Sequence, residues 1–335
     1  MAQYIKTEEG YKKLATFTND KMDKFDPVGI GSFSMNRKVG TVIGVNSHAE
    51  GNSTTASGDS SHAEGGSTKA NGTDSHAEGY FTTASGYSSH AEGYWATASG
   101  DYSHSEGGST KASGRYSHAE GNGTKASGTD SHAEGGSTTA SGYSSHAEGN
   151  STNQFSSVVT ATNPTINSII TDWKTKKFSV AKGDSSHVEG KDNLALGDYS
   201  HAEGYWTTAK GNNSHAEGDA TIASGYSSHA EGSYTTASGS QSHAEGDHTT
   251  ANGEGSHVQG KYNIEDTSNI YADIIGNGTS DTARSNAATV DWNGNAWFAG
   301  DVYTGSTSGT NKDEGSKKLA TEEYVNSSIA ASGNI

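Results

Sequence analysis

The feature that most constrains this chain is a pentapeptide, Ser-His-Ala-Glu-Gly, which recurs at steps of 14 residues in two blocks. The first block holds eight copies and the second holds six, with substitutions at Ser105, Val188, Val258 and Gln259. In most copies an alanine follows eight residues after the histidine, as Ala56 does, and a glycine follows two residues later. Two short segments separated by glycine turns predict one coil of a narrow, all-β solenoid.

Side chains alternate across a β-strand, so each copy assigns its residues to two faces. Ser47 and Ala49 are expected to face one way, and His48 and Glu50 the other. The small residues suit a cramped interior, which leaves the histidines and glutamates outside. With a rise of about 4.8 Å for each coil, the 14 coils predict a rod roughly 65 Å long.

The composition agrees with a narrow rod and excludes several classes of protein. Only 29% of the residues are hydrophobic and 45 are glycine, so a wide apolar core is not expected, while the strict period argues against disorder. A net charge of -17 with scattered basic residues argues against nucleic-acid binding. No segment approaches the roughly 20 apolar residues of a membrane span. There is no cysteine, and the N-terminal MAQYIKTEEGYKK lacks an apolar signal-peptide region, so export by the usual route is not expected.

A roll filled with Ala, Ser and Thr buries little apolar area, at about 25 cal/mol per Å², and is not expected to be stable alone. We therefore expect a homotrimer in which three rolls bury their histidines and glutamates along a common axis. Phe33 and Met35 occupy the equivalent positions of an irregular first coil and are expected either to plug this axis or to cap a single roll. The predicted ladder comprises His48, Glu50, His62, Glu64, His76, Glu78, His90, Glu92, His104, Glu106, His118, Glu120, His132, Glu134, His146, Glu148, His187, Glu189, His201, Glu203, His215, Glu217, His229, Glu231, His243, Glu245, His257 and Gln259.

The pattern S-H-A-E-G-x-x-T-T-A-S-G resembles the YadA-like head repeats of trimeric autotransporter adhesins. The resemblance covers about 47–150 and 179–261, and the 14-residue spacing makes it specific. It implies a left-handed parallel β-roll, threefold symmetry and binding to host surface molecules. His and Glu stand where that family usually carries an aliphatic pair facing the axis, which predicts a polar ladder in place of a hydrophobic seam.

The SHAEG form and its flanks are more similar to tail-fibre proteins of phages and prophages of Gram-positive bacteria. The flanks are SFSMNRKVGTVIG at Ser32 to Gly44 and a longer segment from Ile274 to Gly305. This similarity implies a fibre on the tail of a virion or phage-like particle. Its expected partners are a tail or baseplate protein at the N-terminus and a bacterial surface glycan or protein receptor. A bacterial surface adhesin of the autotransporter type is the alternative.

Segments outside the repeat complete the predicted organisation. A helix is expected over Glu8 to Phe25, and Ile270 to Gly276 and Ala287 to Tyr303 predict strands with an Asn-Gly turn. An apolar insertion near 154–178, which includes Trp173, either contacts a ligand or locks the trimer. The predicted units are a helical attachment segment (1–30), a first coil or cap (31–46), roll block 1 (47–153), the insertion (154–178), roll block 2 (179–261), a small β module (262–312) and a helical connector (313–335).

Ser, His and Glu invite a catalytic-triad interpretation, but adjacent Ser47 and His48 should point to opposite faces of a strand. No catalytic residue and no cofactor is therefore expected, and the chain is predicted not to be an enzyme; a tail-associated depolymerase is the remaining alternative of that class. His-x-Glu places both side chains on one face, which predicts a hydrogen-bonded ladder or, as the alternative, a metal site. Aromatic residues at variable rim positions are candidate ligand contacts: Tyr80, Phe81, Tyr94, Trp95, Trp173, Tyr205, Trp206 and Tyr234.

Overall fold

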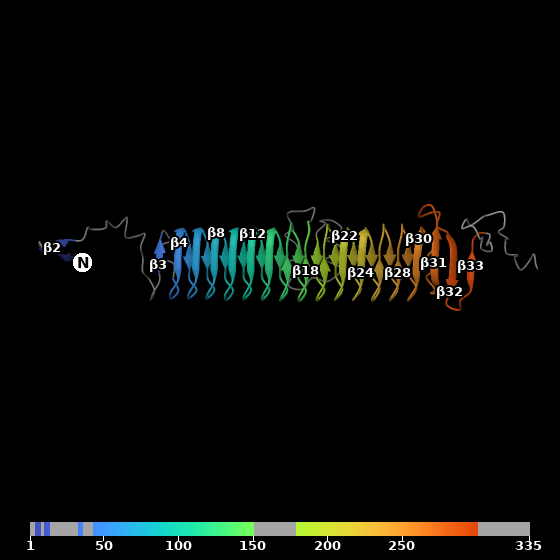
Figure 1. Cartoon of the computed structure of the whole chain (residues 1–335), viewed down its shortest axis with the longest axis horizontal. Coiled ribbons are helices and arrows are strands. Elements are labelled where there is room, and N and C mark those ends of the chain that lie inside the picture. The colour runs from blue at the N-terminus through green and yellow to red at the C-terminus, as the bar shows by residue number, and fades with distance from the viewer. Residues whose placement is uncertain (1–3, 8–9, 14–32, 36–42, 151–178, 301–335) are drawn as a thin grey trace, which may run out of the picture.

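The computed structural model describes residues 4–7, 10–13, 33–35, 43–150 and 179–300 of the 335-residue chain. Its central part is a long stack of β-coils in which strands of successive coils lie side by side (Figure 1). All strand pairings between coils are parallel, and no helix occurs among the described residues. The predicted all-β parallel solenoid with 14-residue coils is thus confirmed.

One long sheet is formed by the strands that begin at the repeat histidines, and we call it the His/Glu sheet. Each strand pairs in register with the equivalent strand of the next coil, so that His90 lies beside His104 and Glu92 beside Glu106. Its parallel strands are β3 (Phe33–Met35), β4 (His48–Asn52), β6 (His62–Gly66), β8 (His76–Tyr80), β10 (His90–Tyr94), β12 (His104–Gly108), β14 (His118–Asn122), β16 (His132–Ala133), β18 (His146–Ala147), β20 (His187–Val188), β22 (His201–Tyr205), β24 (His215–Asp219), β26 (His229–Ala230), β28 (His243–Ala244) and β30 (His257–Lys261).

The second half of each coil contributes a two-residue strand to a 13-stranded parallel sheet, which we call the Thr/Ala sheet. Across the insertion, β18 pairs directly with β20, so the coil stack continues from His146 to His187. The strands of the Thr/Ala sheet are β5 (Thr55–Ala56), β7 (Lys69–Ala70), β9 (Thr83–Ala84), β11 (Thr97–Ala98), β13 (Lys111–Ala112), β15 (Lys125–Ala126), β17 (Thr139–Ala140), β19 (Val180–Ala181), β21 (Leu194–Ala195), β23 (Thr208–Ala209), β25 (Ile222–Ala223), β27 (Thr236–Ala237) and β29 (Thr250–Ala251).

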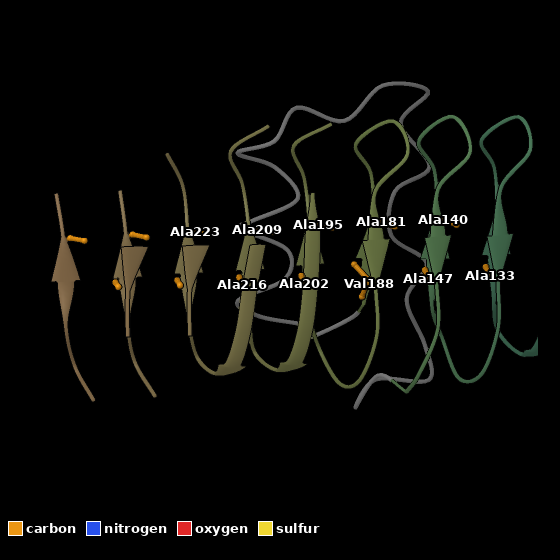
Figure 2. Packing of buried hydrophobic residues seen from close by; sticks show 14 of the residues in the cluster. Ala133, Ala140, Ala147, Ala181, Val188, Ala195, Ala202, Ala209, Ala216 and Ala223 are labelled. Atoms are coloured by element: carbon orange, nitrogen blue, oxygen red, sulfur yellow. The ribbon is translucent and has the colours of Figure 1, made fainter. Parts of the chain in front are cut away.

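The interior between the two sheets is narrow and consists of alanine, serine and threonine. Ala91 and Ala98, from opposite sheets, are both fully buried, and equivalent alanines repeat along the rod (Figure 2). The serine before each histidine is also buried; the Ser61 hydroxyl donates a hydrogen bond to the Gly58 carbonyl at 2.6 Å. These serine hydroxyls are thus paired locally, whereas buried threonine hydroxyls such as that of Thr82 make no hydrogen bond within the described residues.

Close approach of successive turns explains why each coil needs its glycines. A Cβ built on Gly100 would lie 1.9 Å from the carbonyl oxygen of Gly114, which no side chain could tolerate. Gly93, within the SHAEG strand, has φ +107°, a left-handed conformation that other residues rarely adopt. The turns therefore fix the spacing of the coils by direct backbone contact.

The C-terminal strands extend the His/Glu sheet. β31 (Tyr271–Asn277) pairs in parallel with β30, and β32 (Asn286–Asp291) and β33 (Ala296–Phe298) continue the sheet in antiparallel order. The expected Asn-Gly turn joins the last two strands, where the Asp291 carboxylate accepts hydrogen bonds from the Asn293 and Asn295 amides at 2.9 and 2.8 Å. This antiparallel hairpin ends the stack of identical parallel coils.

The N-terminal helix prediction is wrong over the residues described there. β1 (Tyr4–Thr7) and β2 (Gly10–Lys13) form an antiparallel pair, with Tyr4 opposite Lys13. Glycine disfavours a helix interior by about 1 kcal/mol, and Gly10 instead lies where the hairpin closes against Thr7. The rest of that predicted helix, the insertion at 154–178 and the connector at 313–335 lie outside the described residues. Within the described ranges, no helix has the length and apolar character needed to cross a membrane.

Candidate functional site

The most regular surface of the molecule is a column of stacked imidazoles on the outer face of the His/Glu sheet. Consecutive rings from His48 to His257 have centroids 4.7 to 5.0 Å apart, and most planes are within 8° of parallel. The stack crosses the insertion without a break, because His146 and His187 are 5.0 Å apart. In-register parallel strands impose this spacing on every side chain of one column.

A column of glutamates runs beside the imidazoles. At the N-terminal end each Nε2 faces the carboxylate of its own coil, at 3.4 Å for His48 and Glu50. Towards the C-terminal end it faces the carboxylate of the preceding coil, at 3.5 Å for His229 and Glu217. We call the two columns together the His/Glu ladder, and both are about one-third exposed in a single chain.

Stacking of carboxylates changes their acidity in an alternating pattern. A shared hydrogen bond with Glu134, together with desolvation and like-charge repulsion, raises the pKa of Glu120 to about 7. The pKa values of Glu92 and Glu203 are raised to about 7 in the same way, by hydrogen bonds with Glu78 and Glu217 respectively. In the alternate coils, the bond received from Glu120 lowers the pKa of Glu134. Neighbouring carboxylates therefore share protons along the ladder.

The histidine pKa values shift in the opposite sense to the raised glutamates. Burial and the adjacent imidazoles His104 and His132 lower the pKa of His118, outweighing the attraction of nearby carboxylates. The same causes act on His62, His90, His146, His201 and His215. At neutral pH these rings are therefore uncharged and retain a nitrogen lone pair.

Four aromatic side chains form an exposed patch on the edge of the rod where the His/Glu strands turn towards the Thr/Ala sheet. Tyr80 stacks on Tyr94 at 5.9 Å, the Phe81 ring lies 4.9 Å from the Trp95 ring at a tilt of 36°, and the four rings are 39 to 55% exposed. Phe81 and Trp95 have φ of 59° and 61°, a conformation unusual for bulky residues. We call this set the aromatic patch.

The other predicted contacts are distributed along the same edge and do not join the patch. Tyr205 and Trp206 stack on one another at 4.8 Å, with the Lys191 ammonium 5.5 Å from the Tyr205 ring. Tyr234 stacks on His248 at 4.7 Å. Trp173 lies outside the described residues.

Tyrosines that precede SHAEG lie on the opposite edge, where Tyr87, Tyr102 and Tyr116 contact one another. Tyr102 stacks on Tyr116 at 4.9 Å, and the Arg115 guanidinium lies 4.7 Å from the Tyr116 ring. These contacts cover the turn backbone, although the rings remain exposed.

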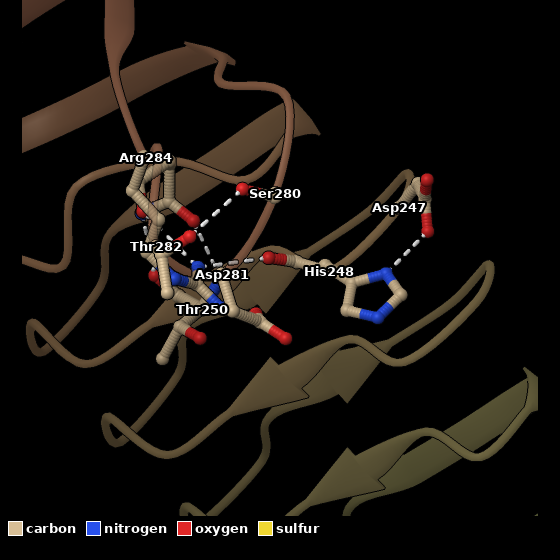
Figure 3. Close-up of polar contacts among 8 residues, drawn as sticks. Asp247, His248, Thr250, Ser280, Asp281, Thr282 and Arg284 are labelled. Carbon is tan, nitrogen blue, oxygen red and sulfur yellow. Dashed lines mark hydrogen bonds and ion pairs between the residues drawn. The ribbon is translucent and has the colours of Figure 1, made fainter.

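Sequence reasoning missed a polar cluster at the C-terminal end of the roll. His248 stacks between Tyr234 and Tyr262, and its Nδ1 lies 2.6 Å from an Asp247 carboxylate oxygen. Arg284 donates to the His248 carbonyl at 3.0 Å and pairs with Asp281 at 2.7 Å, which ties the hairpin to the last coils (Figure 3). The 14-residue spacing of Tyr234, His248 and Tyr262 was the available signal for the stack.

The structure keeps Ser47 and His48 apart, as expected for opposite faces of a strand. The Ser47 hydroxyl is buried and donates to the Gly44 carbonyl at 2.7 Å, whereas His48 lies on the outer face. Phe33 and Met35 of β3 pair in register with His48 and Glu50, respectively. Whether they plug an axis stays a prediction.

The comparisons with known proteins agree with this geometry. The family model of the YadA head domain repeat matches residues 40–61, 216–242 and 230–256. No curated protein matches the chain significantly. The matched segments lie in both blocks of the solenoid, and their strands belong to the same in-register stack. The chain therefore carries YadA-like head repeats at the matched segments, and the same 14-residue coil continues in register between them.

Proposed function

We propose that three copies of this chain assemble through their His/Glu ladders into a non-enzymatic attachment fibre. The observation that carries the proposal is the uniformity of the ladder: all 14 coils carry histidine, and 13 of them carry glutamate two residues later. The outward positions of the Thr/Ala sheet vary instead, with Thr97, Lys111 and Ile222 among them. If every coil contacts the equivalent coil of an identical chain, every coil requires the same side chains at the contact.

The energetics of one roll favour the same conclusion. Its interior consists of alanine, serine and threonine, and these side chains bury little apolar surface on folding. The imidazole stack, about one-third exposed, offers a continuous surface along the rod that association could still bury. Histidines of one copy can then pair with glutamates of another at each level, which relieves the repulsion within each carboxylate column.

Sedimentation equilibrium of the purified chain tests the assembly. We expect a species of three times the 34.5 kDa chain mass at micromolar concentration. A monomer under those conditions contradicts the proposal.

We propose that the aromatic patch binds a glycan of the target cell surface. Its rings remain exposed at turn positions where the flanking coils carry Gly108 and Ser109, so the turn itself does not require them. The left-handed conformation of Phe81 and Trp95 recurs at Ser67 and Ser109 in the flanking coils, so it belongs to the turn and not to the rings. Flat aromatic faces with polar surroundings suit the apolar faces of sugar rings.

Alanine substitutions test the aromatic patch. Tyr94→Ala with Trp95→Ala should weaken binding to target cells and to glycans on an array at least about tenfold, a change of about 1.4 kcal/mol. Tyr143→Ala is the matched control, because this ring is equally exposed (54%) but lies on the opposite edge. Equal binding by both variants would contradict a role for the patch.

We further propose that the fibre belongs to the tail of a phage or phage-like particle and that its N-terminal segment joins the tail or baseplate. The similarity of Ser32 to Gly44 and of Ile274 to Gly305 to phage tail-fibre flanks supports this placement. Immunogold electron microscopy of particles from the producing cells should label the tails. Labelling of the cell envelope alone would favour a bacterial surface adhesin instead.

A further inference from the structure

We propose that the outer face of the C-terminal hairpin, strands β31 to β33, sets the register of the assembled chains along the fibre axis by contacting the same face of its copies. The proposal rests on the assembly proposed above, and it assigns to this end of the rod a task that the His/Glu ladder cannot perform. We call this surface the apolar face, and it consists of Ile275, Ala288, Val290, Ala296 and Phe298.

A uniform ladder leaves the relative position of the chains along the axis poorly defined. All 14 coils carry histidine, and 13 of them carry glutamate two residues later. If one chain slides by one coil, one of the 14 levels loses its partner, and the other 13 still face a ladder level of the neighbouring chain. A repetitive face specifies register weakly, because the slipped pairing makes nearly the same contacts. The correct register therefore requires residues that differ from the ladder and lie on the same face.

Strand pairing places the apolar face in line with the glutamate column. Gln259, the last member of that column, pairs in register with Ile275 of β31. Ile275 pairs in turn with Ala288, and Ala288 pairs with Phe298. Residues that lie directly opposite each other on neighbouring strands point to the same face of a sheet. The glutamate column thus continues into apolar side chains without a change of face.

The histidine column ends in the same way. Asp273 pairs with His257, and its Oδ1 atom lies 3.1 Å from His257 Nδ1. Beyond this last charged contact, Val290 pairs with Asp273, and Ala296 pairs with Val290. Both columns therefore change from charged to apolar within the hairpin, where Figure 1 shows β31 to β33 at the end of the coil stack.

The apolar face is exposed in a single chain. Ile275 is 38% and Phe298 is 52% exposed, whereas Ile274 and Thr289, which alternate with them along their strands, are buried on the inner face. Exposed apolar residues gathered on one face mark a contact surface. A second copy fits this surface, because rods that lie side by side in register bring each residue level with its own copies. A slip by one coil would place Ile275 opposite Gln259 of a neighbouring chain, which the hydrophobic effect disfavours.

Cross-linking between different levels of the ladder tests the proposal. Chains that carry Glu106→Cys are refolded together with chains that carry Glu134→Cys, and mass spectrometry identifies the linked peptides after mild oxidation. The two positions lie two coils apart. This axial separation of about 9.6 Å exceeds the Cα separation of about 7 Å that a disulfide can span. Chains in register therefore link equal positions only, whereas slipped chains also link position 106 to position 134.

Substitutions in the hairpin should release the register. Ile275→Thr combined with Phe298→Ser, introduced into both cysteine chains, should increase links between the two levels at least about tenfold, because only the uniform ladder then aligns the chains. Trp297→Ser is the matched control, because this ring is 56% exposed but lies opposite buried Thr289, on the other face of the same strand. It should leave links between equal positions only. Circular dichroism establishes that each protein is folded.

Three results would overturn the register proposal and leave the fibre in place. The first is a folded hairpin variant that still links equal positions only. The second is frequent linkage between the two levels when the hairpin is unchanged, and the third is a Trp297→Ser variant that links them as often as the hairpin variant does. A wild-type chain that sediments as a monomer instead rejects the assembly itself.

Discussion

At the scale of single residues, the stacked glutamates of the ladder repel one another, and hydrogen bonds between neighbouring carboxyl groups reduce this repulsion when one of the two is protonated. Glu92, Glu120 and Glu203 have pKa values raised to about 7, and the glutamates between them, such as Glu106, have lowered ones. A raised carboxyl pKa means that the folded chain binds a proton that the unfolded chain has lost. Its stabilising contribution is complete below about pH 4.5 and is lost as the pH rises through about 7.

The histidines contribute with the opposite sign. Their lowered pKa values make folding less favourable as the pH falls, because the unfolded histidines, half protonated at pH 6.5, bind protons that the folded rings do not. This dependence fades only about one pH unit above that value. Between about pH 6.5 and 8 the two sets therefore act in opposite directions: the three glutamates with raised pKa values lower the stability as the pH rises, and the six histidines with lowered pKa values raise it. We expect the glutamate contribution to appear as a difference between the wild type and a variant that lacks these three carboxylates.

Glutamine in place of the three raised glutamates tests this assignment. The combined variant Glu92→Gln, Glu120→Gln and Glu203→Gln imitates the protonated carboxyl, so the difference between its melting temperature and that of the wild type should increase from pH 6.5 to 8 and favour the variant at pH 8. Glu254→Gln is a control outside the ladder. A triple variant that keeps the wild-type slope would show that these carboxyls do not share protons.

At the scale of the coil, backbone packing at the glycines sets the geometry that the ladder inherits. Gly100→Ala would place a Cβ 1.9 Å from the Gly114 carbonyl oxygen, so neighbouring coils would have to separate. We expect this change to cost about 3 kcal/mol or more in the free energy of unfolding. Chemical denaturation followed by circular dichroism measures it.

Gly300→Ala is the matched control for that substitution, since nothing lies within 4 Å of its Cβ. It should change the free energy of unfolding by less than about 0.5 kcal/mol. Equal stability of the two variants would mean that the turns are looser than described.

The coil could be predicted from the sequence because the 14-residue period fixes the positions of the turns, of the inward alanines and of the outward histidines at once. Buried Asn193 was not predictable, because its side chain replaces the usual threonine and bonds to the Glu189 and Gly204 carbonyls at 2.6 and 2.8 Å. The N-terminal strands were not predicted, because the helix prediction relied on the spacing of apolar residues and did not take account of Gly10, which disfavours a helix. Proton sharing between glutamates also escaped prediction, since it depends on distances that only stacking in space creates.

At the scale of the whole molecule, the rod repeats one surface along its length, and each coil contacts chiefly its neighbours. The small stabilising free energy that each coil and each interface between coils contributes therefore adds up along the fibre, as in other repeat proteins. The aromatic patch interrupts this uniformity over two coils, which is how a repetitive scaffold can hold a local binding site. The central claim is that identical rods meet through their His/Glu ladders.

Cysteine cross-linking tests that claim most directly, because the natural chain contains no cysteine. Glu106→Cys places a thiol in the ladder, and Lys111→Cys places one on the outer face of the Thr/Ala sheet in the same coil. After mild oxidation we predict disulfide-linked chains for Glu106→Cys and none for Lys111→Cys. Cross-linking at Lys111→Cys, or at neither position in a protein of confirmed fold, would contradict assembly through the His/Glu ladder.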